Sequence, residues 1–482
     1  MPKNNLAPAD HLYMQVAEGL EKMISEDVLK IGDKLPSVRV LSDEYGISMG
    51  TAFQAYYHLE GKGLIESRPK SGYYVRFNQR RFRELPRMIQ PDILSHEVSV
   101  KEMITSIYGD IASSNEKVIN FALAVPDLSL LPAAKINKSV IHVIRHQEDH
   151  CMNYAHPQGD PELRKQIARL SFNWGGKIQP QEVLVTSGCL EAMTLCLRAV
   201  TQPGDTVAIE SPNYFGIYQA IESMGLKVVE ISSSPVTGLD IDSLKQAIQK
   251  HTIKACVVIP NFNNPLGGCM PDEQKKKLVA LITKHAIPLI EDDIYGELYF
   301  GKKRPRTCKY YDTKGLVMYC SSLSKSLSPG YRIGWTIPGK FIEQLKQIKR
   351  IHNISSPAIT QAAIAHYLQH GRYEYHLKNI RKALHTQCLR YLQGIVEYFP
   401  EDTKVSRPAG GFVLWVQLNK KVNSFKLRIE AMKHHISVVP GKIFSGSSNY
   451  NNCIRISFGK PWDDNAEYGL QMLGRIIRKM MA

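Results

Sequence analysis

From residue 118 onward, short apolar runs bounded by turns alternate with segments of helical periodicity. Each run has the length of a buried strand and is too short for a buried helix. The runs cover residues 183–186, 206–209, 228–231, 255–259, 288–290, 317–320 and 335–337. Strands that alternate with helices predict an α/β architecture with a mainly parallel, helix-covered sheet. Ligands of such sheets bind at the carboxyl ends of the strands, so the residues after each run are candidate site residues.

The chain of 482 residues is long enough for two or three domains, each with its own core. No apolar run reaches the roughly 18 residues that a membrane span needs, and the first thirty residues lack the apolar core of a signal peptide. We therefore expect no membrane partner. The formal net charge of +16 favours an anionic partner, nucleic acid first.

The nine cysteines are scattered, odd in number and without CxxC pairs. This pattern indicates a reducing, cytoplasmic location and argues against disulfides and structural zinc. We expect no metal site.

The apolar run 317–320 leads into the stretch Ser321-Ser-Leu-Ser-Lys-Ser-Leu-Ser-Pro-Gly-Tyr-Arg-Ile-Gly-Trp335. Its lysine, Lys325, is a useful nucleophile only when burial or a nearby cation favours the neutral amine. Arg332, together with Ser322 and Ser324, has the chemistry to hold a phosphate dianion. A lysine for an aldehyde and a Ser/Arg set for a phosphate together describe a site for pyridoxal 5'-phosphate (PLP). The alternative is a surface lysine on a solvated loop.

Two further strand ends carry polar or aromatic groups that suit such a cofactor. Gly188 follows the run 183–186 and opens a helical segment, so that the backbone N–H groups of Gly188 and Cys189 face a phosphate. Tyr214, after the run 206–209, can stack on a pyridine ring. The alternative for Gly188 is a plain left-handed turn.

The runs at 255–259 and 288–290 are followed by Asn264 and by Asp292, with Tyr295 one helical turn beyond. PLP draws electrons only while its ring nitrogen stays protonated, and that needs a buried carboxylate. Asp292 is the candidate carboxylate, and Tyr295 can bond the phenolic oxygen. Taken singly, each residue has an equally good structural explanation.

The string around Lys325 resembles the Schiff-base signature S-x-S-K-x-x-x-P-G-x-R-x-G of fold-type I aminotransferases. The resemblance covers residues 118–482 and implies a fold-type I body with a small C-terminal α+β lobe. It makes Lys325 the catalytic lysine, with Asn264 and Tyr295 at the ring hydroxyl and Asp292 at the ring nitrogen. It assigns Tyr214 to ring stacking and Ser322 and Arg332 to the phosphate.

Two more motifs extend this resemblance. The string from Tyr154 to Arg164 resembles Y-x-x-P-x-G-x-x-x-L-R, whose tyrosine reaches the phosphate of a neighbouring subunit, so it implies a homodimer. Arg455 stands where the family binds a substrate α-carboxylate in a bidentate manner. One stretch departs from the family. Residue 124, usually a glycine, is Ala124, so the substrate mouth is expected to differ from that of an efficient transaminase.

Residues 9–77 form a separate unit in the sequence. Leu12, Val16, Leu20 and Ile24 recur at helical spacing. Ser37 is placed to cap a second helix that ends at Gly46, and Ser48 to cap a third that stops at 61–63. Residues 64–65 and 73–75 then predict a hairpin around the turn at 68–72. This order predicts a winged helix-turn-helix, whose third helix enters the major groove of DNA.

The strings Gly32-Asp-Lys-Leu-Pro-Ser-Val-Arg-Val-Leu-Ser42 and Ser71-Gly-Tyr-Tyr-Val75 resemble the GntR family of bacterial repressors. The resemblance implies DNA contacts from the arginine of the P-S-x-R motif, the start of the third helix and the wing. The implied residues are Arg39, Ser48, Thr51, Gln54, Lys70, Ser71 and Gly72. Many relatives have arginine or asparagine at position 49, where this chain has Met49, so one contact is expected to be lost. The alternative is that Arg39 and Thr51 are only surface and capping residues.

Residues 61–83 contain seven basic residues and one acidic residue, whereas residues 1–83 as a whole contain twelve basic and ten acidic residues. The unit is therefore polarised, with phosphate contacts expected from the wing and the segment behind it. The segment 78–117 is too long for an ordinary connection and is interpreted as an inter-domain linker. A helix between residues 98 and 111 and disorder are equally supported.

Both resemblances in this order describe the MocR-like subgroup of GntR regulators. We expect a PLP-dependent transcription regulator that binds a double-stranded DNA operator and senses an amino compound or PLP itself. The main alternative is an active aminotransferase with an appended DNA-binding domain, because every residue that transamination needs is present. A DNA-binding scaffold with a dead body is disfavoured, since Lys325 and Asp292 are both retained.

Overall fold

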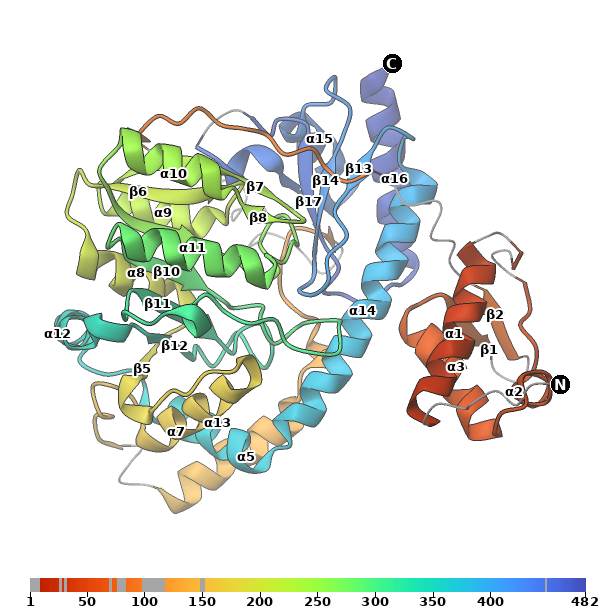
Figure 1. The fold of residues 1–482 in the computed structure, drawn as a ribbon, viewed down its shortest axis with the longest axis horizontal. Helices are drawn as coiled ribbons and strands as arrows, with labels where there is room; N and C mark the ends of the chain where they lie inside the picture. Colours follow the sequence, from red (N-terminus) through yellow and green to blue (C-terminus); the bar gives the residue numbers. More distant parts are fainter. Residues whose placement is uncertain are drawn as a thin grey trace.

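The computed structural model describes residues 9–25, 28–29, 33–68, 72–75, 84–97, 118–147, 152–446 and 449–482. A small N-terminal unit, called the head below (residues 9–75), lies beside a large α/β body (Figure 1). Of the described helices, none is long and apolar enough to cross a membrane.

The head has three helices followed by a two-stranded hairpin. These elements are α1 (Ala9–Ser25), α2 (Val38–Tyr45), α3 (Met49–Gly61), β1 (Ile65–Arg68) and β2 (Gly72–Val75), with β1 and β2 antiparallel. The Ser37 hydroxyl accepts from the Val40 N–H at 3.2 Å, and the Ser48 hydroxyl accepts from the Thr51 N–H at 3.1 Å. Gly46 ends α2 with a φ of 60°, a conformation that costs glycine little. The predicted caps and the winged helix-turn-helix order are confirmed.

The body is built on one large, mainly parallel sheet with the strand order β3-β7-β6-β9-β10-β11-β12-β5. The strands are β3 (His96–Glu97), β5 (Leu184–Thr186), β6 (Thr206–Ser211), β7 (Lys227–Ser234), β9 (Ile253–Val258), β10 (Leu289–Asp292), β11 (Val317–Ser322) and β12 (Gly334–Ile337). The pairs β7/β6, β6/β9, β9/β10 and β10/β11 are parallel, and β12 is antiparallel to both of its neighbours. A short strand, β8 (Gly238–Leu239), pairs with β7. The predicted α/β sheet is confirmed, and each apolar run overlaps a strand.

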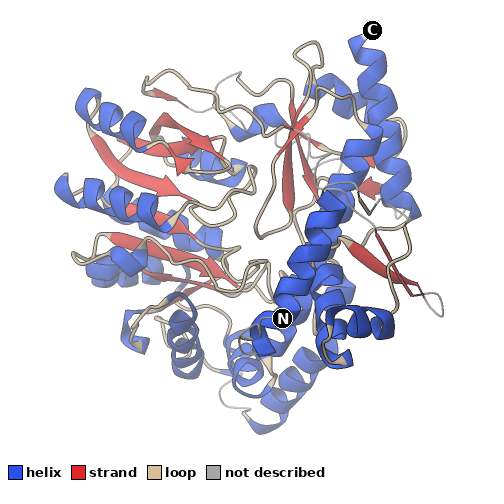
Figure 2. Cartoon of the chain, turned by 45° about the vertical axis from the view of Figure 1, so that its right-hand side comes forward, coloured by secondary structure: helices blue, strands red, loops and turns tan. Residues whose placement is uncertain are grey.

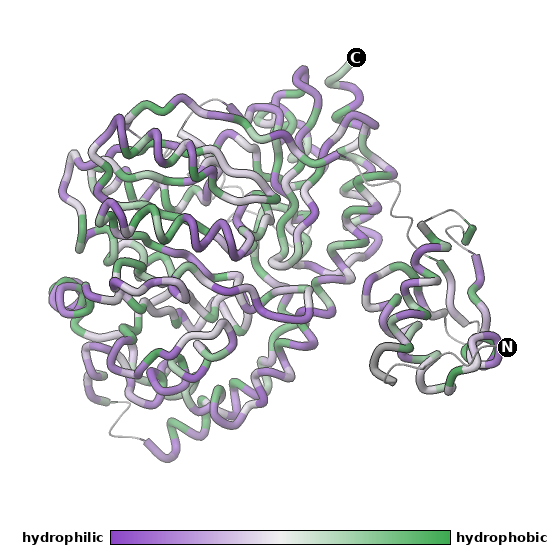
Figure 3. Tube along the Cα trace, viewed as in Figure 1, coloured by the Kyte–Doolittle hydropathy of each residue, from purple (hydrophilic) through white to green (hydrophobic). Residues whose placement is uncertain are grey.

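Helices cover both faces of this sheet (Figures 1 and 2). Val207 and Ile209 of β6 pack in one apolar cluster with α8 (Cys189–Val200) and α9 (Phe215–Ser223). Ala208, between them, packs in another cluster with α10 (Ile241–Lys250) and α11 (Asp272–Lys284). Successive residues of a strand point to opposite faces, so a sheet buried on both faces needs continuous apolar runs. Figure 3 shows the resulting green interior of the body.

A smaller lobe is formed by the last part of the chain and one early strand. Its antiparallel sheet has the order β13 (Lys404–Val405), β14 (Val413–Gln417), β17 (Cys453–Ser457) and β16 (Val439–Pro440). Around it lie α15 (Ser424–Met432), α16 (Asp464–Met481) and the long α14 (Tyr373–Tyr398). β4 (Ile119–Asn120) pairs in parallel with β15 (Ile436–Ser437), so residues 118–127 enter the body through this lobe.

The remaining helices of the body are α5 (Ala133–His146), α7 (Pro161–Leu170), α12 (Ile342–Asn353) and α13 (Ala358–His370). α5 and α13 pack together through Val143, Ala362 and Ala363. α14 follows α13 directly and runs diagonally across the molecule towards the head (Figure 1).

The described part of the segment between head and body, residues 84–97, lies along the body. Val405 donates its N–H to the Glu84 carbonyl at 2.9 Å, and Arg87 donates its N–H to Gln417 Oε1 at 3.0 Å. At its end, His96 pairs with Val228 of β7 in the large sheet. The helix considered for residues 98–111 lies outside the described residues.

Candidate cofactor and effector site and candidate DNA interface

A cavity of about 280 Å³ opens at the carboxyl ends of the central strands, between the large sheet and the small lobe. Nine of the predicted site residues line it: Cys189, Tyr214, Asn264, Asp292, Tyr295, Ser324, Lys325, Arg332 and Arg455. They come from strand ends spread over 267 residues of chain, from 189 to 455 in the sequence. The structure therefore brings together groups that the sequence places far apart.

Lys325 lies in this cavity and donates from Nζ to the carbonyl oxygen of Ala124 at 2.6 Å. Burial and the nearby Arg455 cation lower the pKa of Lys325 to about 8, against the smaller opposing effect of Asp292. With such a pKa, roughly a tenth of the amine is neutral at pH 7, far more than for an ordinary lysine, and this neutral form can attack a carbonyl carbon.

Asp292 ends β10 and lies at the floor of the cavity, 3 % exposed. Its Oδ1 accepts from the Ile294 N–H at 3.0 Å and from the Cys189 thiol at 3.2 Å. Burial raises the pKa of the carboxyl to about 6, because these hydrogen bonds only partly replace its hydration. A cationic ring nitrogen at this place would stabilise the carboxylate that burial disfavours.

Arg332 lines the cavity, and Gly188, although not in the lining, lies against its guanidinium. Arg332 has a φ of 52°, unusual for a residue with a side chain, and donates from Nη2 to the Ser187 carbonyl at 2.7 Å. A Cβ on Gly188 would lie 2.4 Å from Arg332 Nη2, so only glycine leaves this space open. The guanidinium beside the amino terminus of α8 makes a place for an anion.

The two serines beside the lysine lie differently. Ser324 lines the cavity and its hydroxyl lies 3.4 Å from Arg332 Nη1. Ser322 lies behind the cavity wall, where its hydroxyl donates to the Ile333 carbonyl at 2.8 Å and accepts from the Ser324 N–H at 3.0 Å. Ser322 therefore holds the turn that presents Ser324 and Lys325, and does not itself line the cavity.

Arg455, on β17, is 2 % exposed and reaches the cavity from the small lobe. Its Nη1 donates to Asn264 Oδ1 at 3.2 Å, and its Nη2 donates to the Ala122 carbonyl. The guanidinium also lies over the Phe444 ring at 5.4 Å. A planar guanidinium with its donors turned to neutral oxygens can exchange those partners for a carboxylate.

Tyr214 and Tyr295 frame the cavity from two sides. A Cβ on Gly216 would lie 2.5 Å from Tyr214 Cε1, so this glycine makes room for the Tyr214 ring. Tyr295 is 3 % exposed, and burial raises the pKa of its hydroxyl well above its ordinary value. The phenol therefore stays protonated and remains a hydrogen-bond donor.

Sequence analysis placed Ala124 at the substrate mouth, but it did not predict that backbone carbonyls of residues 122–125 would serve as acceptors in this cavity. Ala122, Leu123, Ala124 and Val125 all line it, and two of their carbonyls accept hydrogen bonds from Arg455 and Lys325. Backbone acceptors leave no signature in side-chain type, although the departure at Ala124 marked the right stretch.

Tyr154 lies outside the lining of its own cavity. Its side chain is 83 % exposed, and the neighbouring Met152 is 89 % exposed. The sequence placed this tyrosine in a neighbouring subunit's site, and the single chain leaves it available at the surface.

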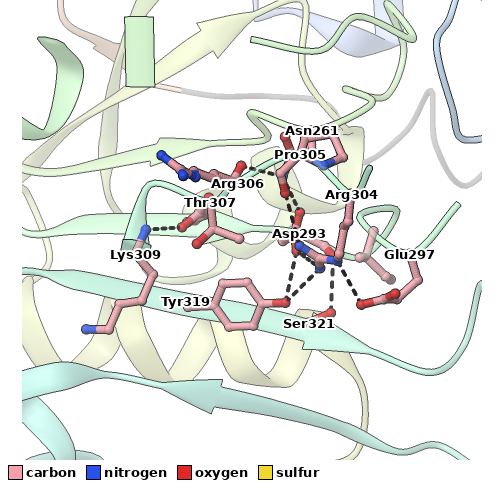
Figure 4. A network of polar contacts seen from close by, with 12 residues as sticks. Asn261, Asp293, Glu297, Arg304, Pro305, Arg306, Thr307, Lys309, Tyr319 and Ser321 are labelled. Carbon is pink, nitrogen blue, oxygen red and sulfur yellow. Dashed lines mark hydrogen bonds and ion pairs between the residues drawn. The ribbon is translucent and has the colours of Figure 1, made fainter. Parts of the chain in front are cut away.

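Behind Asp292, a group of buried charges fixes the start of the loop that follows β10 (Figure 4). Asp293 Oδ2 accepts from Arg304 Nη2 at 2.5 Å and from the Tyr319 hydroxyl at 2.9 Å. Arg304 Nε donates to Glu297 Oε1 at 2.8 Å. Sequence analysis missed these residues, because their contacts join positions that no local pattern relates.

The predicted DNA-binding residues of the head lie on its exposed side. Arg39 and Gln54 are exposed, Thr51 is half-buried, and Ser48 is exposed at the amino end of α3. Gly72 opens β2. Lys70 and Ser71 lie outside the described residues.

The comparisons with known proteins agree with both parts of the structure. Residues 116–473 match the family model described as aminotransferase class I and II, and residues 12–75 match that of bacterial regulatory proteins of the gntR family. YjiR, an HTH-type transcriptional regulator of Escherichia coli whose function is uncharacterized, is 35% identical over 97% of this chain and 99% of its own length.

Two solved structures each match about four fifths of this chain. LysN, an α-aminoadipate aminotransferase of Thermus thermophilus complexed with N-(5'-phosphopyridoxyl)-L-leucine, superimposes with a TM-score of 0.72 at 25% identity, over 80% of this chain and 99% of that one. A kynurenine aminotransferase of Pyrococcus horikoshii gives a TM-score of 0.73 at 26% identity, over 79% and 95%. The fold is that of fold-type I aminotransferases. The chain belongs to the class I and II aminotransferase family and carries a GntR-type helix-turn-helix domain at its amino end, the MocR-like architecture.

Proposed function

We propose that this protein is a PLP-dependent, DNA-binding transcription regulator that senses an amino compound in its aminotransferase-like body. The observation that carries the proposal is a single cavity holding Lys325, Asp292, Arg332 and Arg455, followed in the chain by a loop whose Lys302 contacts Met14 of the head. When bound, PLP supplies an aldehyde that reacts with amines and a ring that withdraws electrons.

The cavity has a suitable residue for each functional group of this cofactor. Lys325, with its lowered pKa of about 8, supplies a neutral amine. Arg332, Ser324 and the N–H groups of Gly188 and Cys189 hold the phosphate, and Asp292 holds the ring nitrogen in its protonated form. Tyr214 stacks on the ring, while Asn264 and Tyr295 serve its hydroxyl. Arg455 is left for the carboxylate of an amino compound.

A loop joins this cavity to the head and supports a regulatory role. Tyr295 lines the cavity, and Glu297 lies two residues further along the same loop. The Glu297 carbonyl accepts a hydrogen bond from Nε of Arg381, on α14, at 2.6 Å. The Arg381 guanidinium also lies over the Tyr299 ring at 4.0 Å. Phe300 stacks on His385 of α14 with ring centroids 4.9 Å apart.

The same loop and α14 contact the head directly. Lys302 Nζ lies 3.3 Å from Met14 Sδ on α1. Lys382 of α14 lies over the Tyr57 ring of α3 at 4.2 Å. A Cβ on Gly63 would lie 2.3 Å from Leu389 Cδ1, so the turn after α3 sits tightly on α14. A ligand that moves Tyr295 or Arg455 can therefore bias the position of the head, as an equilibrium shift between two arrangements.

We propose that the protein acts as a homodimer. Large apolar side chains are exposed before and after α5, with Leu128 at 80 %, Met152 at 89 % and Tyr154 at 83 %. A second copy of the chain would cover these side chains, and Tyr154 would then reach the phosphate site of that copy. A DNA-binding dimer in the cytoplasm, with the described cysteines as free thiols, agrees with this picture.

The experiment that tests the proposal measures the affinity of full-length protein for a selected operator in three states: cofactor-free, with PLP, and with PLP plus candidate amines. We expect a change of about 1–3 kcal/mol, or roughly 5–150-fold, on addition of the right amine. Arg455→Ala should abolish the response to the amine while PLP and basal DNA binding remain. Identical affinities in all three states would refute a sensing role.

The route through α14 has its own test. Leu389→Arg disturbs the contact between α14 and the head from the body side, so the head keeps its fold. We expect the ligand response of the operator affinity to shrink, while PLP binding is retained. Lys276→Glu, an exposed change on α11 away from the head, serves as the control. An unchanged ligand response in Leu389→Arg would rule out this route.

An enzyme is the second candidate function, favoured by the retention of Lys325, Asp292 and Arg455 in one cavity. The carbonyls of Ala122 and Ala124 engage Arg455 and Lys325, and a substrate or an effector would have to displace them alike, so these contacts do not separate the two functions. Keto-acid formation from a mixture of amino and keto acids decides between the two. Efficient turnover together with a ligand-independent operator affinity would favour the enzyme.

A further inference from the structure

The recognition helix α3 carries neither lysine nor arginine along its whole length, Met49–Gly61. Ala52, Ala55, Tyr56 and Leu59 are buried in the core of the head, which leaves the opposite side of the helix for a partner. Helical periodicity places Gly50, Phe53, Gln54 and Tyr57 on that opposite side, with Met49 at its edge.

This outward face is uncharged and partly apolar. Met49 is 55 % exposed and Phe53 is 51 % exposed, one helical turn apart. Gln54 is exposed beside them, and Gly50 adds no side chain to hold the helix away from a partner. Large apolar side chains that lie together in water usually mark a contact surface. Tyr57, further along, already contacts Lys382 of the body, so the free part of the face is the amino-terminal half.

The edges of base pairs in the major groove can be matched to these side chains. Guanine is read most often by arginine or lysine, which α3 does not have. Adenine is read by the amide of glutamine or asparagine, and the thymine methyl group is read by apolar contact. Gln54 supplies the amide, and Phe53 and Met49 supply apolar surface at its side.

We infer that α3 reads a run of A·T pairs, with Gln54 on adenine and with Phe53 and Met49 against thymine methyl groups. Met49 therefore replaces a charged contact with an apolar one, and the operator half-site has thymines where a basic residue would favour guanine. Attraction to the phosphates comes from outside α3, with Arg39 exposed at the start of α2. The inference rests on the proposal that α3 is the helix that reads DNA.

The experiment selects binding sites for the full-length protein from a random duplex DNA library at one fixed salt concentration. We expect enriched half-sites with a run of A·T pairs at their centre. Replacement of single thymines in that run by deoxyuridine removes one methyl group and should weaken binding about three- to fivefold at each contacted position. Phe53→Ala should make the protein insensitive to one of these replacements, whereas Phe53→Leu should stay sensitive.

Two controls separate this inference from the proposed role of α3. Tyr45→Ala removes another exposed aromatic ring of the head, at the far end of α2 from Arg39, and should leave the discrimination between thymine and deoxyuridine intact. Thr51→Ala should weaken binding to every selected site. A guanine-centred half-site, no enriched sequence, or no effect of deoxyuridine would overturn the inference. If Thr51→Ala and Phe53→Ala both leave binding unchanged, α3 is not the reading helix and the proposed DNA face itself fails.

Discussion

The cavity of the body and the proposed DNA-binding face of the head differ in whether their charged and polar side chains are buried or exposed. In the cavity, Asp292, Lys325 and Arg455 are buried charges, and each is held by hydrogen bonds to defined partners. On the head, Arg39 and Gln54 are exposed, and Phe53 is half in water. Buried charges are costly unless they are paired, so the cavity requires particular residues at particular places.

An exposed reading face carries no such cost. Changing Met49 or Phe53 alters what the head binds without leaving an unpaired charge in its core, because the fold depends on Ala52, Tyr56 and Leu59. The comparison therefore predicts that substitutions in the cavity damage both chemistry and stability, whereas substitutions on the exposed side of α3 change partner binding alone.

The largest expected effect is at Lys325. Wild-type protein incubated with PLP should become yellow, with a visible absorption band that survives dialysis. Lys325→Ala should lose the band and release the cofactor on dialysis, because no other amine lines the described part of the cavity. A wild-type protein that shows no such band would refute the cofactor assignment.

The pH dependence of cofactor capture tests the same lysine more finely. The neutral amine attacks the aldehyde, and the pKa of Lys325 is about 8, lowered mainly by burial. The neutral fraction, and with it the rate of capture by cofactor-free protein, should therefore fall about tenfold for each pH unit below 8. A rate that stays constant down to pH 6 would mean that Lys325 is not the attacking group.

The next effect in size concerns the buried charges behind Asp292 (Figure 4). Arg304→Met leaves Asp293 unpaired in the interior, where the two side chains are 2 % and 0 % exposed. Breaking a buried ion pair in this way should lower the free energy of unfolding of the body by about 3–5 kcal/mol. Denaturant unfolding measures this loss as a lower midpoint concentration. Lys165→Met is the matched control, because its pair with Glu162 is 59 % and 54 % exposed and should cost less than about 1 kcal/mol. Equal losses of stability in Arg304→Met and Lys165→Met would contradict the claim that the buried pair matters more than the exposed one.

Sequence reasoning was strong where a residue type serves a local need. Ser37, Gly46 and Ser48 end or begin helices as predicted, and Asp292 stands at the end of a predicted strand. It was weak where the contact partner of a residue lies far away in the sequence. Arg304 pairs with Asp293 across a loop, Arg381 reaches that loop from α14, and the Ala122 carbonyl binds Arg455 across 333 residues. No period or motif relates such positions.

The exposed face shows a different limit. From the sequence we predicted that Met49 removes a basic contact. The helix geometry shows in addition that Met49 lies one turn from the exposed Phe53, so that the two side chains form one apolar surface. Ser322, which the resemblance assigns to the phosphate, is absent from the cavity lining, and its hydroxyl donates to the Ile333 carbonyl, so its phosphate role stays a prediction. A motif records which residues occur together, and packing decides which of them face the ligand.

On the head, we expect smaller effects that spare the body. Arg39→Ala and Thr51→Ala should each weaken operator binding by about 1–3 kcal/mol, the usual cost of one base or phosphate contact. Neither should change the visible band of bound PLP, which is the control within the same sample. Loss of the band in Arg39→Ala would contradict the separation of head from cavity.

The smallest expected effect comes from two serines that do the same structural work. Ser37 and Ser48 each accept a hydrogen bond from a backbone N–H at 3.2 and 3.1 Å, so Ser37→Ala and Ser48→Ala should each cost the head about 1 kcal/mol of stability. Ser48 also lies 2.8 Å from the Thr51 hydroxyl at the end of α3 that is proposed to face DNA. Ser48→Ala should therefore weaken operator binding further than Ser37→Ala at equal stability, by about threefold to tenfold. Thermal unfolding of the head and operator binding, measured on both variants, test this difference. Equal losses of binding would mean that Ser48 is only a helix cap, and the proposed reading surface would then begin at Met49.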